Sequence, residues 1–214
     1  KSMFIIKGVV MNKLTLFRLL CSFWIIFALS GCGYNDIQSD DENVNATWAE
    51  VLNQYQRRAD LVPNLVASAK GYAAHESEVF AQIAEARAKI GGLPNMQQAP
   101  QDEQSIKQFQ QAQASMSSAL SRLLVVNEKY PDLKSDQLYT NLMVQLEGTE
   151  NRIAVARHRY VQAVQTYNTR IRTFPNNLTA SWKGYKPKLT FQPENIESIS
   201  TAPKIDFSTS STAK

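Results

Sequence analysis

The sequence predicts an all-α protein, an antiparallel up-and-down four-helix bundle with long helices. The main observation is an apolar stripe between Ser135 and Phe174, whose members recur every three or four residues, or after seven where Thr149 fills the gap. This spacing places them on one face of a helix of about forty residues, roughly 60 Å long. The stripe consists of Leu138, Leu142, Leu146, Ile153, Ala156, Tyr160, Val164, Tyr167 and Ile171. Such a stripe needs other helices beside it, and no strand-like alternation of useful length precedes residue 174.

Three further apolar stripes supply the other helices, so we expect helices at about 41–60, 61–90, 104–128 and 134–173. Asp60 can cap the second helix, and Pro63 is tolerated in a first turn, which favours a break between the first two helices. The alternative is a three-helix bundle whose first helix is kinked at Pro63. Ser135 or Asp136 can cap the long helix, and Pro175 stops it.

The start of the chain has the features of an export signal. Met11 is a better start than Lys1, so we treat residues 1–10 as an upstream extension that is not native. Two basic residues follow Met11, and then comes the apolar run Leu19–Leu29. This run is shorter than the roughly 20 apolar residues of a comfortable membrane span. We therefore predict a lipoprotein signal peptide at 11–31.

The apolar run ends in a lipobox, in which a cysteine is acylated and becomes the mature N-terminus: Leu29, Ser30, Gly31 and Cys32. A lipid such as palmitate on Cys32 would bind the membrane, with a polar tether at 32–40. Gly33 stands where an aspartate would signal inner-membrane retention, so we expect the outer membrane, facing the periplasm, in a two-membrane bacterium. The alternative is an uncleaved anchor formed by Leu14–Leu29, and Arg18 within that stretch counts against it.

Charge and composition exclude several function classes. The net charge of +4 is accounted for by four basic leader residues, so the part after Cys32 is formally neutral and lacks the basic footprint of a nucleic-acid binder. The other cysteine, Cys21, would leave with the signal peptide, so the mature chain has no thiol for catalysis or for a metal. His75 and Glu78 form one weak pair three residues apart, and we expect no metal and no cofactor.

The rest of the chain divides into a bundle and a tail. We expect the helical bundle at 41–175, with a Gly-, Gln- and Pro-rich loop at 91–104. Residues 176–214 contain scattered prolines and a Ser/Thr-rich end, which predicts an irregular C-terminal tail. Five apolar residues could pack part of this tail against the bundle: Leu178, Trp182, Tyr185, Leu189 and Phe191.

Six sequence blocks follow one another along the chain: RRADLVPNLV at 57–66, KGYAAHE at 70–76, RLLVVNEKYPDLKSD at 122–136, EGTENRI at 147–153, YNTRI at 167–171 and PKIDF at 203–207. Together, in this order, they resemble the LemA family over roughly residues 34–207. The resemblance implies an α-helical bundle anchored at a bacterial membrane, with no established enzymatic activity. Many relatives keep an N-terminal membrane helix, whereas this chain carries a lipobox, so its mode of anchoring is argued from its own residues.

The most suggestive polar residues lie around the junction of the first two expected helices and on the fourth. They are Arg58, Asp60, Glu147, Glu150, Asn151, Arg152 and Asn168. Glu147 and Glu150 lie one turn apart, so they could act as general acid and base. We favour a structural interpretation, an ion network reached by side chains from 57–60, because no nucleophile, metal set or phosphate-binding loop accompanies the two carboxylates. Asn168 is expected to cap or bridge a neighbouring helix.

These observations favour a non-enzymatic, lipid-anchored envelope protein whose bundle binds an unknown protein partner or organises an envelope complex. One alternative is an envelope hydrolase using Glu147 and Glu150. Another is a module that binds a peptide or a small lipid in a groove between helices. An enzyme needs a concave pocket with converging polar groups, so the structure can distinguish these classes. Five aromatic residues occur at helical spacing and are expected in the core: Trp48, Tyr55, Tyr72, Tyr160 and Tyr167.

Overall fold

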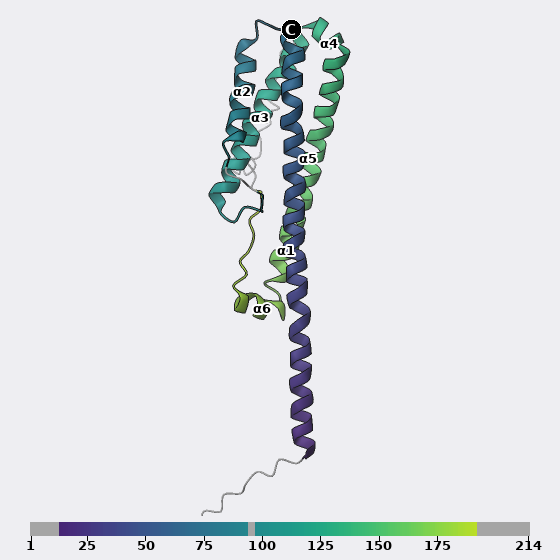
Figure 1. Ribbon diagram of the computed structural model, residues 1–214, viewed down its shortest axis with the longest axis vertical. Helices are drawn as coiled ribbons and strands as arrows, with labels where there is room; N and C mark the ends of the chain where they lie inside the picture. The colour runs from purple at the N-terminus through teal and green to yellow at the C-terminus, as the bar shows by residue number, and fades with distance from the viewer. Residues whose placement is uncertain (1–12, 94–96, 192–214) are drawn as a thin grey trace, which may run out of the picture.

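The computed structural model describes the backbone of residues 13–93 and 97–191, and side chains mainly from Gly33 onward. This part of the chain is all-helical, as the sequence predicts, and it contains no strand. Figure 1 shows a long, narrow molecule in which helices lie beside one another. The helices are α1 (Lys13–Lys70), α2 (Ser77–Gly91), α3 (Glu103–Lys129), α4 (Pro131–Ser135), α5 (Gln137–Arg170) and α6 (Asn176–Lys183).

Helix α1 is 58 residues long and continues through Pro63, so the preferred break at that position is wrong. The buried stripe of α1 continues without interruption past the proline, through Val62, Leu65 and Ala69. Burial of these side chains outweighs the roughly 3 kcal/mol that an interior proline costs a helix. The chain leaves the helix instead at 71–76, where Gly71 is a poor helix former, and α2 follows as a separate helix. The expected helix at 61–90 is therefore divided between α1 and α2.

Helices α3 and α5 lie close to the predicted positions, and each begins at an aspartate. The Asp102 side chain accepts a hydrogen bond from the Ser105 backbone N–H at 2.7 Å, and this caps α3. The Asp136 side chain accepts from the Tyr139 N–H at 2.7 Å, and this caps α5 as one of the two predicted residues. The predicted cap at Asp136 is thereby confirmed, and the short helix α4 precedes it.

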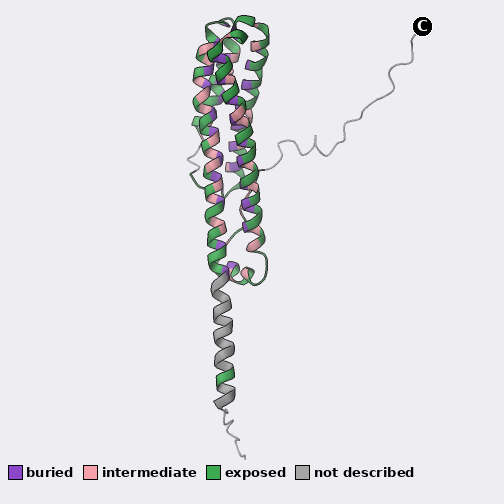
Figure 2. Ribbon diagram, turned by 90° about the vertical axis from the view of Figure 1, so that its right-hand side faces the viewer, coloured by how far each residue is buried: buried purple, intermediate pink, exposed green. Residues whose placement is uncertain are grey.

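The buried residues form two apolar clusters along the axis of the molecule, on sides of the helices that face one another (Figure 2). The first cluster, the distal core, joins the C-terminal part of α1 to α2, α3, α4 and the start of α5; its largest members include Leu65, Phe80, Ile83, Met116, Leu123, Leu133 and Tyr139. The second, the proximal core, joins residues 37–55 of α1 to Phe109 of α3, the end of α5 and Ala180 of α6. The continuous pairing of α1 with α5 connects the two cores (Figure 1).

Two segments predicted to be irregular are helical. Residues 32–40, expected as a tether, belong to α1, and Ile37 is fully buried in the proximal core. Gly33 lies so close to α6 that a Cβ atom there would come within 2.2 Å of the Asn176 side-chain oxygen. Residues 176–183, expected in the tail, form α6, which ends at Gly184 with a left-handed φ of 73°. Both segments are ordered because they pack against each other, a tertiary effect that local composition does not reveal.

Candidate functional site

The candidate site is a polar network around Arg58, which lies between the two cores. Its side chain is only 2% exposed. Nη1 donates hydrogen bonds to Glu150 Oε1 and to Ser117 Oγ, each at 3.0 Å. Nη2 donates to the Gln113 backbone oxygen at 3.3 Å and to the Gln113 side-chain oxygen. The guanidinium carbon also lies 5.0 Å from the centroid of the Tyr55 ring. The network thus joins α1, α3 and α5.

The electrostatics of this network favour pairing over catalysis. A buried guanidinium is costly unless an anion and further acceptors surround it, and Glu150 supplies the anion. The side chain of Glu150 is 42% exposed, so the network reaches solvent at that edge. Burial raises the pKa of the neighbouring Tyr55, against the opposing effect of Arg157 and then Arg58. Arginine stays protonated in proteins, so Arg58 presents a permanent cation to the Glu150 side chain.

The structure brings together only two of the polar residues singled out from the sequence, Arg58 and Glu150. Glu147 is exposed and does not share the network, so the two carboxylates do not converge on a common space. The other members bind elsewhere: Asp60 accepts from Gln56 of the same helix at 2.7 Å, Arg152 donates to Thr149 Oγ1 at 2.9 Å, and Asn151 is exposed. The residues therefore do not form the acid–base pair that a hydrolase would need.

Gln113 and Ser117 are the members of the network that the sequence analysis missed. Gln113 is 6% exposed and occupies an apolar stripe position between Phe109 and Met116. A polar residue at a position where its helix is otherwise buried is the signal that could have identified it, because such a group needs a partner. Ser117 carries no comparable signal, since serines are common on the exposed faces of this helix.

Asn168 binds a non-helical segment, not the neighbouring helix that was expected. Residues 185–191, here called the C-terminal strap, follow α6 and lie along α5. Asn168 donates from Nδ2 to the Lys188 backbone oxygen at 2.9 Å and accepts from the Lys188 N–H at 2.8 Å. About two turns before Asn168 on α5, the Tyr160 hydroxyl donates to the Leu189 backbone oxygen at 2.8 Å. Burial raises the pKa of Tyr160, which favours the protonated hydroxyl that donates this bond.

Replacing Asn168 with alanine is expected to loosen the C-terminal strap. Loss of both hydrogen bonds should lower the free energy of unfolding by about 1–2 kcal/mol, because the Lys188 backbone groups lose their partners. Hydrogen exchange at 185–191 should speed up, while exchange within α5 should stay unchanged. Asn151→Ala, at an exposed position of the same helix, is the matched control. Equal rates of hydrogen exchange at 185–191 in the two variants would show that the two Asn168 hydrogen bonds do not hold the strap.

Four of the five aromatic residues expected in the core are buried there: Trp48, Tyr55, Tyr160 and Tyr167. Tyr72 is the exception, with 44% exposure, and its hydroxyl donates to the Asp136 carboxylate at 2.9 Å. That bond fastens the turn after α1 to the start of α5. Phe191 of the strap adds a further ring to the proximal core, 5.9 Å from Trp48 and 5.3 Å from Tyr160 between centroids.

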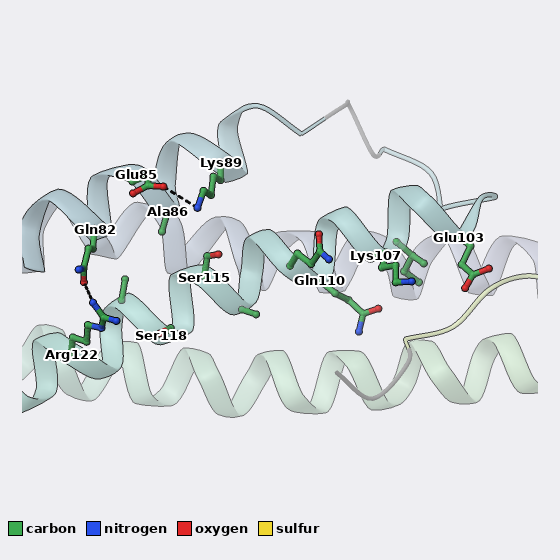
Figure 3. Close-up of a pocket in the computed structure, with 14 residues that line it drawn as sticks. Gln82, Glu85, Ala86, Lys89, Glu103, Lys107, Gln110, Ser115, Ser118 and Arg122 are labelled. Atoms are coloured by element: carbon green, nitrogen blue, oxygen red, sulfur yellow. Dashed lines mark hydrogen bonds and ion pairs between the residues drawn. The ribbon is translucent and has the colours of Figure 1, made fainter. Parts of the chain in front are cut away.

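A groove of about 730 Å³ lies between α2 and α3, and we call it the α2–α3 groove (Figure 3). None of its lining residues belongs to the Arg58 network. The groove is open because the α3 side chains that line it include small ones, among them Ala114, Ser115 and Ser118. Charged and amide side chains form its edges. Lys89 pairs with Glu85 at 3.0 Å, and Arg122 donates to Gln82 (Figure 3). The groove offers hydrogen-bonding groups of both kinds and charges of both signs.

Metal binding and membrane crossing find no support in the described region. No group of His, Cys, Asp and Glu there is arranged to hold a metal ion. No helix, as far as its residues are described, combines the length and apolar character that a membrane crossing requires. The lipobox side chains from Leu29 to Cys32 lie outside the described residues, although the backbone there continues α1.

The fold and the network define a class: an elongated all-α protein in which a buried arginine joins three helices. The family profile described as LemA matches residues 47–207. The chain belongs to the LemA family, as the sequence blocks indicated.

The proteins similar to this chain include two magnetosome proteins and a protein named LemA. The chain is 30% identical to magnetosome protein MamQ 2 of Paramagnetospirillum magneticum over 178 residues, covering 74% of this chain and 64% of the relative. It is 27% identical to magnetosome protein MamQ of Magnetospirillum gryphiswaldense, covering 72% of this chain and 62% of the relative. Protein LemA of Metamycoplasma hominis is 22% identical, with coverage of 77% and 71%. The chain therefore spans just under two thirds of the length of the MamQ proteins.

Proposed function

We propose that this chain is a membrane-anchored, non-enzymatic module of the bacterial envelope that binds another protein. In this proposal α1, α2, α3 and α5 act as an up-and-down four-helix bundle, and the binding surface is the α2–α3 groove. The groove is the observation that carries the proposal, because it is the hollow in which polar groups are arranged around open space. The Arg58 network, in contrast, is filled by its own partners.

The lining of the α2–α3 groove suits a peptide segment of a partner protein. Its volume of about 730 Å³ lies within the range of about 300–1,000 Å³ typical of ligand sites. Backbone amides and polar side chains of a peptide would meet the amides of Gln82 and Gln111 and the hydroxyls of Ser115 and Ser118. The lining mixes apolar and polar surface, so a lipid tail would leave the amide, hydroxyl and charged groups of the groove without hydrogen-bond partners. Peptide binding is thus favoured over small-lipid binding.

Filling the groove tests this proposal. Ser118→Trp places a large side chain in the α2–α3 groove and should reduce partner capture at least tenfold in a crosslinking pull-down from intact envelopes. Ala154→Trp, the same bulk at an exposed position of α5, is the matched control and should capture the partner normally. Circular dichroism melting of both variants checks the fold. Undiminished capture by a folded Ser118→Trp variant would reject the groove as the binding surface.

A hydrolase is the second class, and the geometry supports it less. Glu150 is bound by a cation that is itself buried, and Glu147 is exposed one turn away. A general base must reach a substrate proton within hydrogen-bonding distance, and neither carboxylate lines one of the three main grooves in the described part of the chain. The network is better understood as a device that fixes the register of α1 against α3 and α5.

We also propose that the chain is cleaved immediately before Cys32 and that this cysteine is acylated, which would anchor the module to the membrane. A single acyl chain binds only marginally, whereas the three chains of lipoprotein-type processing would each add about 0.8 kcal/mol per buried CH₂. Gly33 after the cysteine favours the outer membrane, facing the periplasm, in a two-membrane envelope. The uncleaved anchor remains the alternative. In either case the membrane lies next to Gly33, where α1 enters the proximal core.

Replacing Cys32 with serine is expected to block processing and to leave an uncleaved precursor held by its signal. Mass spectrometry of the wild-type protein should show an N-terminus at Cys32 with a triacyl mass, and the variant should retain the residues before it. Cys21→Ser is the matched control, because this cysteine lies inside the apolar run and should be lost with the signal. An unmodified wild-type N-terminus at Met11 would favour the uncleaved anchor.

A further inference from the structure

Helix α6 carries an apolar face that nothing in the described structure covers. Phe174, just before the helix, is 79% exposed, and Leu178 and Trp182 within it are 63% and 82% exposed. Leu178 and Trp182 lie four residues apart on the helix and therefore share one side, and we call these two residues together with Phe174 the α6 face. The opposite side of the helix holds the buried Ala180 of the proximal core. Large exposed apolar side chains gathered on and just before one short helix indicate a binding surface.

The α6 face lies at the end of the bundle from which α1 continues toward the N-terminus (Figure 1). Asn176 at the start of α6 contacts Gly33 of α1, and Lys183 at its end lies 5.6 Å from the ring centroid of Tyr34. Gly33 directly follows Cys32 and lies four residues after the apolar run that ends at Leu29. The face is therefore next to the point where either form of anchor would meet the membrane.

The charges around the α6 face are of one sign. Residues 172–191 contain four basic residues and no acidic residue, in a chain whose part after Cys32 is formally neutral. Lys188 is paired with Asp41 at 2.8 Å, whereas the other three are exposed: Arg172, Lys183 and Lys186. The acidic residues closest to this end of α1, Asp36 and Asp40, are already paired with Arg170. The exposed charge near the face is thus positive.

We propose that the α6 face sits in the headgroup region of an anionic lipid bilayer, with α6 lying along the membrane surface. Tryptophan favours this region because its ring is apolar and its N–H is polar, and Trp182 is the most exposed member of the face. Lys183 and Lys186 attract anionic headgroups while the apolar side chains enter the boundary with the acyl chains. A protein partner would not require the position beside the anchor or the single sign of charge.

The proposal rests on anchoring next to Gly33, and it can be tested apart from anchoring. The full chain with Trp24→Phe, which leaves Trp48 and Trp182, is reconstituted into vesicles of phosphatidylcholine with phosphatidylglycerol. Flotation of the vesicles measures anchoring. Quenching of tryptophan emission by lipids brominated near the headgroup end of the acyl chains measures insertion. The same chain with Trp182→Phe gives the contribution of Trp48, which is fully buried in the proximal core.

We expect Trp182 emission to fall at least twofold with brominated lipids and Trp48 emission to stay unchanged. Lys183→Gln with Lys186→Gln should weaken insertion by about fivefold per charge removed, while the distant pair Lys129→Gln with Lys134→Gln should not. Floating vesicles in which Trp182 is quenched no more than Trp48 would overturn the proposal and leave anchoring intact. Failure to float would overturn anchoring, and the proposal with it. Equal insertion into purely zwitterionic vesicles would refute the selectivity for anionic lipid.

Discussion

Replacing Trp48 with alanine is expected to lower the free energy of unfolding by about 3–5 kcal/mol. The side chain is 0% exposed and lies at the centre of the proximal core. Its ring centroid lies 5.2 Å from those of both Phe109 and Tyr160, and 5.9 Å from that of Phe191. Alanine would leave a cavity among α1, α3, α5 and the C-terminal strap, and such close-packed rings cannot collapse to fill it.

Urea unfolding followed by circular dichroism measures this loss, and the chain offers a matched control. Trp182→Ala makes the same chemical change at a side chain that is 82% exposed. It should change the free energy of unfolding by no more than about 0.5 kcal/mol in the absence of lipid. A similar loss in the two variants would contradict the placement of Trp48 in the core.

Replacing Glu150 with alanine is expected to cost about 2–3 kcal/mol, because Arg58 would remain charged and buried without an anion. A fully buried pair would cost more when broken, roughly 3–5 kcal/mol, and an exposed one at most about 1 kcal/mol. Glu150 is 42% exposed and Arg58 is 2% exposed, so the value should fall between these limits. Gln113 and Ser117 still accept hydrogen bonds from Arg58 in this variant, which reduces the loss in the free energy of unfolding.

Glu147→Ala removes the same group one turn away at an exposed position, and it should leave the melting temperature nearly unchanged. Adding Arg58→Met to Glu150→Ala should recover part of the lost stability, since an apolar side chain no longer needs an anion. A double variant that is less stable than Glu150→Ala alone would argue against a stranded cation. An unaltered melting curve in Glu150→Ala with lost cellular function would instead favour a binding or catalytic role for this carboxylate.

The sequence predicted what depends on local periodicity and local caps. The stripe of α5 and the cap at Asp136 depend on residues close together in the chain, and both are found in the structure except at Leu138. Leu138 was predicted to be in the stripe but is 62% exposed, and the neighbouring Tyr139 is buried in its place. The continuation of α1 through Pro63 could not be predicted in this way, because the local cost of the proline is visible and the burial on its far side is not. Helix α6 escaped prediction for the same reason, since its order depends on contact with Gly33, more than a hundred residues earlier.

The candidate site shows a similar division. Arg58 and Glu150 could be singled out from the sequence because they are charged residues at the edges of apolar stripes. Their pairing could not be derived, since 92 residues separate them and Arg57 was an equal candidate. Gln113 was missed because its role depends on the Arg58 side chain that faces it, 55 residues away in the chain.

The continuity of α1 gives the molecule a fixed height. From Gly33 to Lys70 the helix has no break, so its far end stands about 55 Å from Gly33, next to the proposed anchor, at 1.5 Å per residue. A flexible tether would let the bundle sample many heights and tilts, whereas a continuous helix packed lengthwise against α5 would hold the bundle rigidly. A partner bound in the proposed α2–α3 groove would be held at a set distance from the bilayer. That distance would also set how far the partner extends into the surrounding envelope.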